Sequence, residues 1–178
     1  AEFDSFADWR DALQHHQAHV LKVQIETLRR LKYRPTGGFS FSTLNDPAPM
    51  ISSSVLDHQR RHKVAYDAVA QATRPVLVIA DALRPMTRPG DIHDIDIHVV
   101  SDLRVALDFA IVDAVASWPG GQQQWRFGGP IPADDVVKVG QINLEVPHAA
   151  GQLELTFTLT CGDITSTNRY AATITTTP

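Results

Sequence analysis

Asn45 and Asp46 are the polar pair whose setting in the sequence is most suggestive of chemistry. They follow an alternating apolar segment and stand directly before Pro47, so they mark the point where a strand would end and a loop would begin. A carboxylate and an amide placed there can hydrogen-bond the hydroxyl groups of a ligand. Both residue types also bond their own backbone and shape turns, and this second role is the preferred one here. Asn45 and Asp46 are therefore candidate ligand-binding residues with a competing structural explanation.

The histidines form two groups that could suggest a metal site. His15, His16 and His19 lie at helical spacing, and His58 and His62 are an i,i+4 pair. Such spacing can place two imidazoles on one helix face, as in zinc sites. No acidic residue completes a closed ligand set, so solvated helix faces are the preferred interpretation of both groups. The sequence predicts no metal or other cofactor.

Two tryptophans could offer a platform on which a sugar ring stacks. Trp118 adjoins the turn signal Pro119-Gly120-Gly121, and Trp125 falls within a short β-rich run. Packing in a core or a hairpin accounts for both positions and is the preferred interpretation. The chain also lacks a Gly-x-Ser-x-Gly nucleophile motif and a glycine-rich phosphate loop with its Lys-Ser/Thr ending.

Composition excludes several classes of partner. The chain has 178 residues, a formal net charge of −4 and a pI of about 6.0, which gives no basic footprint for nucleic acid. No apolar run approaches the roughly 20 residues that span a bilayer. Cys161 is the single cysteine and cannot form an internal disulfide. The sequence predicts neither a nucleic-acid nor a membrane partner, and its length suits one large or two small domains.

Two helices with a strand between them are predicted for the first 74 residues. A long helix begins at Ser5, carries an apolar stripe at helical spacing and continues to Arg34. Residues Phe39–Leu44 alternate apolar and polar side chains, which predicts a strand with two different faces. A second helix is expected at about Asp57–Thr73, where the next proline ends it.

From Val76 onward short β-rich runs recur. Turn signals at residues 88–91, 118–121 and 128–130 separate seven such runs. Seven short alternating strands over about 100 residues predict an immunoglobulin-like β-sandwich. The clearest inward-facing row is Leu153, Leu155, Phe157 and Leu159.

One stretch carries a family resemblance. GGFSFSTLNDPAPMISSSVLDHQRRHKVAYDA, residues 37–68, resembles the end of the catalytic barrel in family-two glycoside hydrolases, with the β-mannosidase-like members most similar. RPVLVIAD, residues 74–81, resembles the beginning of the sandwich domain that follows that barrel. The resemblance implies that residues 1–74 are the end of a (β/α)8 barrel, with its last strand, loop and helix. Residues 75–178 are then an immunoglobulin-like β-sandwich, in a chain that is mostly β, or α+β.

Three positions depart from the family pattern. Relatives carry tryptophan where this chain has Ser42 and Ser53, and proline where it has His62. The two serines remove aromatic side chains that could stack on a sugar.

The resemblance implies a retaining β-glycosidase that uses two glutamates about 5–5.5 Å apart. The family carries these glutamates on barrel strands upstream of the last one. The glutamates of this chain, Glu2, Glu26, Glu145 and Glu154, match neither position. This chain alone is therefore predicted to be inactive, and its carbohydrate substrate would be bound through the parent enzyme. Asn45 and Asp46 would lie on the active-site face of the barrel.

Two further expectations remain open at this point. The predicted strand at Phe39–Leu44 and the first helix would lack their barrel neighbours, so the chain is a possible homo-oligomer through these two elements. The alternative function is a non-catalytic carbohydrate-binding or structural β-sandwich module. A barrel with two strand-end glutamates encoded upstream would favour the enzyme over this alternative.

Overall fold

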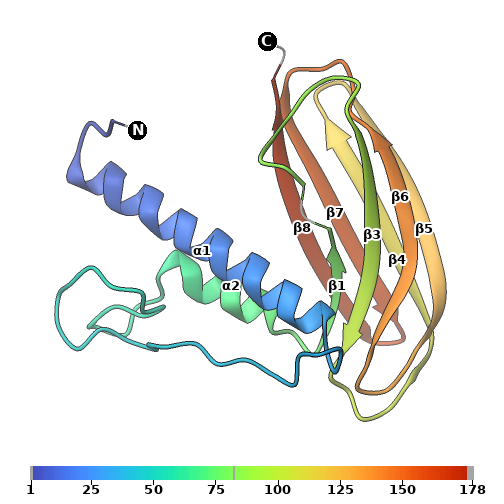
Figure 1. Cartoon of the computed structure of the whole chain (residues 1–178), viewed down its shortest axis with the longest axis horizontal. Helices are drawn as coiled ribbons and strands as arrows, with labels where there is room; N and C mark the ends of the chain where they lie inside the picture. The colour runs from blue at the N-terminus through green and yellow to red at the C-terminus, as the bar shows by residue number, and fades with distance from the viewer. Residues whose placement is uncertain (1, 82, 176–178) are drawn as a thin grey trace. The chain divides into compact units, whose positions relative to one another are not determined.

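The computed structural model describes residues 2–81 and 83–175, and Figure 1 shows the path of the chain. The chain divides into two compact units, Ala1–Arg74 and Pro75–Pro178. The first unit is helical and the second is built from strands, so the predicted mostly β chain with an N-terminal helical segment is confirmed at this level. The last three positions of the predicted sandwich, 176–178, lie outside the described residues.

The first helix, α1, spans Phe6–Arg30 and begins where the sequence predicts. Its N-cap is Ser5, whose hydroxyl accepts a hydrogen bond from the Asp8 backbone N–H at 3.2 Å and donates one to the Asp8 carboxylate at 2.6 Å. Such a cap satisfies a backbone donor of the first turn, and the carboxylate favours the positive end of the helix. The helix ends before the predicted Arg34, because residues 31–36 form a turn.

The strand predicted at Phe39–Leu44 is wrong, since residues 37–43 have no β-ladder partner among the described residues. Phe39 and Phe41 are 38% and 39% exposed, and Leu44 is 56% exposed. A period-two pattern supplies two faces, but a strand also needs a neighbouring strand to take its backbone hydrogen bonds. The described part of the first unit offers no such neighbour, so the segment runs as an irregular loop.

The second helix, α2, spans Val64–Ala72 and is shorter than the predicted Asp57–Thr73. The Asp57 carboxylate accepts hydrogen bonds from the backbone N–H groups of Gln59 at 2.8 Å and Arg61 at 2.9 Å, which folds this segment into a turn. The Arg61 N–H is the main reason that the pKa of Asp57 lies below its usual value. Aspartate side chains compete with helix formation in this way. Within the described residues, no helix is both long and apolar enough to cross a membrane.

The two helices share a small core within the first unit. Its buried members are Ala18, Ile25, Val55, Ala65, Val69 and Ala72. Beside this core, Lys22 Nζ lies 2.6 Å from the carboxylate of Glu26, and burial lowers the pKa of Lys22. The Arg29 guanidinium donates to the carbonyl oxygen of Ala72 at 2.8 Å. This contact satisfies one of the carbonyls that the last turn of α2 leaves open.

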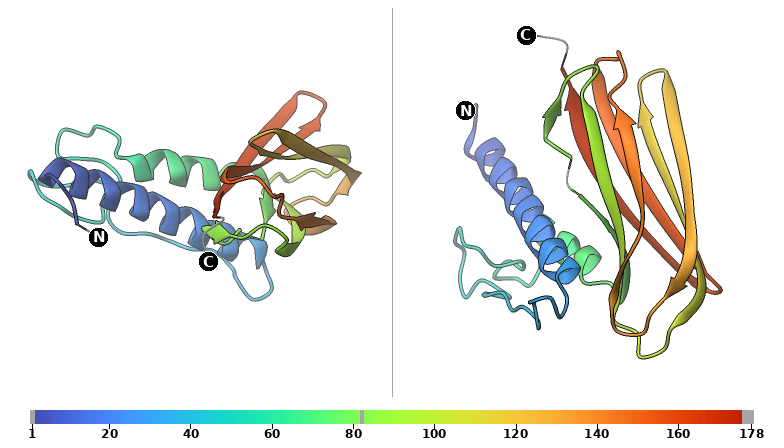
Figure 2. Two further views of the ribbon diagram at one scale, coloured as in Figure 1. Left: turned by 90° about the horizontal axis from the view of Figure 1, so that it is seen from above. Right: turned by 45° about the vertical axis from the view of Figure 1, so that its right-hand side comes forward.

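The described residues of the second unit form a two-layer β-sandwich (Figures 1 and 2), so the prediction of a β-sandwich is confirmed at this coarser level. Its strands are β1 Val76–Ala80, β2 Met86–Thr87, β3 Ile92–Ser101, β4 Leu107–Trp118, β5 Gly121–Ile131, β6 Val136–Glu145, β7 Gly151–Cys161 and β8 Ile164–Ile174. One sheet has the order β1-β3-β6 and the other β2-β8-β7-β4-β5. Paired strands are antiparallel, except that β2 and β8 are parallel. The prediction of seven strands missed β2, because two residues are too few to show a period.

The inward row predicted on β7 is confirmed. Leu153, Leu155, Phe157 and Leu159 are fully buried, while the residues between them are half-buried. They join side chains of β3, β4 and β6 in one hydrophobic cluster that contains residues of both sheets. Each large side chain buried in this way contributes about 1.5–3 kcal/mol to folding.

A turn predicted at residues 128–130 is also wrong, because these residues belong to β5. β5 lies at the edge of its sheet, where Pro130 is tolerated because one side of the strand has no ladder to interrupt. The glycines of this region make room for rings. The Phe109 ring lies close above Gly128, and a Cβ at Gly140 on β6 would overlap the Phe127 ring of β5.

Two polar side chains of β8 satisfy the free edge of β1. The Asn168 amide donates to the Val78 carbonyl oxygen at 2.8 Å, and the Tyr170 hydroxyl accepts from the Ala80 backbone N–H at 3.1 Å. The Asn168 amide and the Tyr170 hydroxyl also bond each other at 3.0 Å. Since β1 is an edge strand, its backbone on one side has no strand partner. These side chains therefore join the two sheets by hydrogen bonds.

We predict that residues 75–178 fold without the rest of the chain, because this unit holds a hydrophobic core and paired sheets of its own. The span expressed alone should show one cooperative thermal transition by circular dichroism. A gradual loss of signal without a cooperative transition would contradict the prediction.

We also predict that Asn168→Leu destabilises the sandwich by about 1–3 kcal/mol, because it leaves a buried carbonyl of β1 without its donor. Urea unfolding of residues 75–178 measures the change. The control is Thr165→Ala at an exposed position of the same strand, which should change stability by less than about 0.5 kcal/mol. Equal effects of the two substitutions would show that the link between the sheets carries no stability.

Candidate functional site

Backbone hydrogen bonds hold three parts of the loop that carries the candidate residues next to one another. The Asp46 N–H bonds the Leu56 carbonyl at 3.1 Å, and the Leu56 N–H bonds the Leu44 carbonyl at 2.9 Å. The Lys63 N–H then bonds the Val55 carbonyl at 3.0 Å. Three segments of the chain that connects α1 to α2 are thus held side by side.

The carboxylate of Asp46 lies at the centre of this loop and is 3% exposed. Lys63 Nζ lies 2.7 Å from Asp46 Oδ2, and the Ser54 hydroxyl donates to Asp46 Oδ1 at 2.5 Å. The Ser52 hydroxyl also donates to Asp46 Oδ1, and Lys63 Nζ donates to Ser54 Oγ at 2.9 Å. We call Asp46, Ser52, Ser54 and Lys63 the loop network.

Hydrogen bonds to its charged form hold Asp46 ionised. They come chiefly from Lys63 and then from Ser52 and Ser54, and they lower the pKa of Asp46 to about 2. Burial opposes this shift, because a carboxylate loses hydration when water is excluded. The hydrogen bonds prevail, so the loop network contains a charged pair at neutral pH.

The structure gives the two candidate binding residues different positions. Asn45 is exposed, and its side-chain amide donates to the Asp46 backbone carbonyl at 3.2 Å. Asp46 is buried and is occupied by the loop network. Both side chains form hydrogen bonds within the loop, which is consistent with the preferred interpretation that they shape the turn. Contact of either residue with a ligand stays a prediction.

The loop is anchored to the core of the first unit. Val55, at 1% exposure, is a member of that core and follows Ser54 of the loop network. The Gln17 amide of α1 donates to the Ser53 carbonyl at 2.6 Å. The partners of Asp46 in the loop network, Ser52, Ser54 and Lys63, are the part of the site that sequence reasoning missed. The Ser-x-Ser spacing of residues 52 and 54 is the only signal for it, and this spacing is common in turns.

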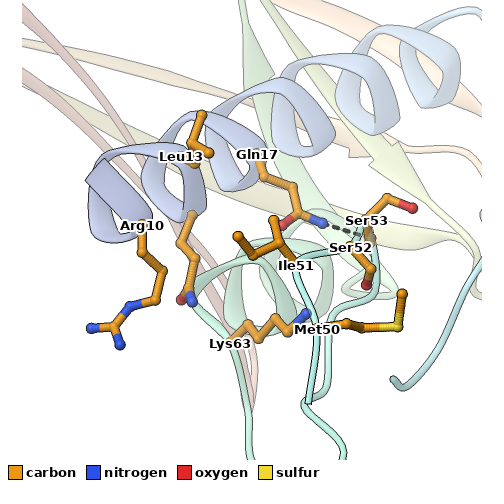
Figure 3. A pocket seen from close by; sticks show the side chains of 9 residues that line it. Arg10, Leu13, Gln17, Met50, Ile51, Ser52, Ser53 and Lys63 are labelled. Carbon is orange, nitrogen blue, oxygen red and sulfur yellow. Dashed lines mark hydrogen bonds between the residues drawn. The ribbon is translucent and has the colours of Figure 1, made fainter. Parts of the chain in front are cut away.

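A pocket of about 230 Å³ lies between α1 and this loop (Figure 3). Its lining residues are Arg10, Leu13, Gln14 and Gln17 of α1, with Met50, Ile51, Ser52, Ser53 and Lys63 of the loop. Three of them are exposed apolar side chains, and the others are amides, hydroxyls and cations. Lys63 and Ser52 belong to both the pocket and the loop network, so the pocket's shape depends on that network.

The histidine groups have local partners. His15 Nδ1 lies 2.8 Å from the Asp11 carbonyl oxygen of its own helix, and the His62 ring stacks on Tyr66 with centroids 3.7 Å apart. In the described part of the chain, no group of three or more His, Cys, Asp and Glu residues could hold a metal ion.

The two tryptophans considered for sugar stacking pack against the sandwich core, as the sequence analysis preferred. Trp118 also covers the hairpin glycine, because a Cβ at Gly121 would lie 2.9 Å from Trp118 Nε1. Other residues of the protein therefore cover part of the surface of both rings.

Comparisons with known proteins give no family assignment. No protein-family model matches the chain, and no curated protein sequence matches it. A similar solved structure is the curli protein CsgC of E. coli, with 13% identity over 53% of this chain and 97% of that chain, at a TM-score of 0.38. Another is a CARDB domain from Pyrococcus furiosus in complex with di-metal ions, with 12% identity over 57% and 92% of the two chains, at a TM-score of 0.43. A family 123 glycoside hydrolase from Clostridium perfringens has 11% identity over 52% and 22%, at a TM-score of 0.40.

We predict that Asp46→Asn destabilises the first unit in a pH-dependent way. The pKa of Asp46 is about 2 in the folded chain and 3.8 ordinarily, so its charge stabilises the fold above about pH 4. Most of this contribution is lost as the pH falls from about 4 toward 2, because the unfolded chain binds its proton first and the folded carboxylate begins to bind one near pH 2. Urea unfolding of the two proteins should therefore differ most near neutral pH and converge toward pH 2.

The matched control is Asp4→Asn, at an exposed side chain of the same unit. It should have little effect at any pH, because an exposed charge contributes little. A difference between wild type and Asp46→Asn that stays constant from neutral pH to pH 2 would contradict the role of the ion pair.

Proposed function

We propose that this chain is the C-terminal portion of a retaining β-glycosidase of the β-mannosidase-like kind in glycoside hydrolase family two. Residues 1–74 would close the catalytic barrel, and residues 75–178 would be the immunoglobulin-like domain that follows it. The parent enzyme would hydrolyse β-linked sugars at non-reducing ends, with no metal cofactor. The isolated chain would supply barrel closure and domain packing but no turnover.

The loop network supports this proposal. Asp46, Ser52, Ser54 and Lys63 all lie within residues 37–68, the stretch that carries the resemblance. The turn made by Asp57 lies there too. If the resemblance to the family were accidental, the residues that match its pattern would not be expected to meet in one buried network. The residues that suggest the family are thus the residues that fold the loop.

The observation that carries the proposal is the exposure of Phe39, Phe41 and Leu44. Their side chains are 38%, 39% and 56% exposed although their pattern suits a strand. Apolar surface left in water forgoes about 25 cal/mol per Å². Neighbouring strands of a barrel would pair this backbone and cover these side chains. A unit that forms part of a larger barrel would expose these apolar side chains when the rest of the barrel is absent.

The described glutamates also support a catalytic centre elsewhere. Glu26 lies on α1, buried beside Lys22, and the two glutamates of the sandwich unit lie on β6 and β7. Glu154 on β7 accepts a hydrogen bond from Thr156 Oγ1 at 3.0 Å. Retaining hydrolysis needs two carboxyl groups about 5–5.5 Å apart on either side of the glycosidic bond. The proposal therefore assigns both catalytic glutamates to the preceding part of the parent enzyme.

The proposal also gives the isolated chain a way to self-associate. A second copy could cover the apolar side chains at Phe39–Leu44 and on α1, where Leu13 is 40% exposed. Dimers formed in this way would be a consequence of the missing barrel, and the longer protein would be free of them.

The test is to sequence the DNA upstream of this coding region and to express the longer open reading frame. We expect upstream β/α units with two strand-end glutamates and turnover of a chromogenic β-mannoside. Replacement of either glutamate by glutamine should abolish turnover. The chain of 178 residues alone should show none with β-mannoside, β-glucoside or β-galactoside.

Two results would contradict the proposal. One is a natural start of the protein near Ala1 with no barrel encoded upstream, which would favour the non-catalytic sandwich module. The other is turnover by the repurified isolated chain that changes in Asp46→Asn, which would place catalysis in this chain.

A further inference from the structure

The pocket between α1 and the loop has the size and lining of a small binding site. Its volume of about 230 Å³ lies below the roughly 300–1,000 Å³ of sites for drug-sized ligands, so it suits one small ring. The apolar side chains Leu13, Met50 and Ile51 are 40%, 54% and 57% exposed. Figure 3 shows Ile51 between the helix side and the loop side of the pocket. One face of a ligand would therefore meet aliphatic groups.

Two polar groups at the pocket retain hydrogen-bonding capacity. Gln14 is half-buried, and its amide has no partner among the described residues. The side chain of Lys63 is 10% exposed, and its ammonium contacts Asp46 and Ser54. An ammonium has three N–H donors, so one remains for a ligand. The amide offers two donors and an acceptor, which suits neighbouring hydroxyl groups that both donate and accept.

The charges at the pocket are already paired. Arg10 lies 2.7 Å from the Asp11 carboxylate, and Lys63 lies 2.7 Å from the Asp46 carboxylate. With both cations paired, a neutral ligand that relies on hydrogen bonds and apolar contact suits this lining better than a phosphate or a carboxylate.

We infer that this pocket binds one neutral pyranose ring of a saccharide. The aliphatic C–H face of the ring would lie on Leu13, Met50 and Ile51, and its hydroxyl groups would bond Gln14 and Lys63. The choice of a sugar as the ligand rests on the proposed function. In the parent enzyme the pocket would hold one ring of the carbohydrate or of a branch of it.

The test is an NMR titration of the full chain with methyl β-D-mannopyranoside and, separately, with methyl β-D-glucuronide. We expect saturable binding of the neutral mannoside with a Kd on the order of 1 mM, with shifts confined to α1 and residues 50–63. Gln14→Ala should weaken binding about fivefold, because it removes one hydrogen-bonding group and alanine keeps the helix intact. Gln24→Ala is the matched control, at an exposed position of α1 that does not line the pocket.

Three results would overturn the inference. They are absence of saturable binding to either sugar, an equal effect of the two substitutions, and binding of the glucuronide alone that disappears with salt. The last result would identify an anion site. These results are independent of the proposed function, because a barrel found upstream with no sugar at this pocket would leave the family-two proposal intact. Sugar binding without an upstream barrel would support the inference and overturn that proposal.

Discussion

The buried ion pair between Asp46 and Lys63 is the contact on which the first unit's loop depends. Taking a carboxylate and an ammonium out of water costs several kcal/mol each unless they are paired and hydrogen-bonded. Here the two serine hydroxyls and the Lys63 ammonium supply those bonds, with Nζ to Oδ2 at 2.7 Å. Because the partners come from three separate segments, the charges can be satisfied only when all three meet. The pair therefore specifies one loop conformation. Lys63 and Ser52 of the loop network also line the pocket.

The two units reach stability by different means. The sandwich has one continuous hydrophobic cluster, and the edge of β1 is satisfied by the Asn168 and Tyr170 side chains of β8. The first unit has six buried apolar residues in its core, three of them alanines. Alanines bury little area, so this core alone contributes little. The unit relies on its ion pairs and hydrogen bonds, and it leaves Phe39, Phe41 and Leu44 exposed.

This contrast fits the proposed origin of the chain. A domain that folds independently buries its large apolar side chains in its own core. A segment of a barrel buries them against the neighbouring strands of that barrel. The loop network needs no barrel, because all its partners lie within 18 residues of one another, from Asp46 to Lys63. The segment at Phe39–Leu44 would form a strand only beside neighbouring strands, which the proposed barrel would supply. Local contacts thus keep the loop folded while the apolar segment stays open.

The sequence by itself determined the elements whose formation rests on local pattern. Ser5 and Asp8 predicted the start of α1. The alternation from Leu153 to Leu159 predicted both the strand β7 and its buried face. Both signals lie within a few neighbouring residues. Asn45 and Asp46 could likewise be selected as special from their place before Pro47, but their separate roles could not.

Only the tertiary structure decided what depends on distant partners. It made Asp46 a buried ion-paired centre and left Asn45 on the surface, because the folded loop brings Lys63, 17 positions later in the chain, to the Asp46 carboxylate. It turned the segment from Gly128 to Pro130 into part of an edge strand, since pairing with β4 outweighs the local turn preference. It also left Phe39–Leu44 without a ladder. A local pattern of residues shows which secondary structures a segment can form. The partners that the fold brings to the segment determine which of them it does form.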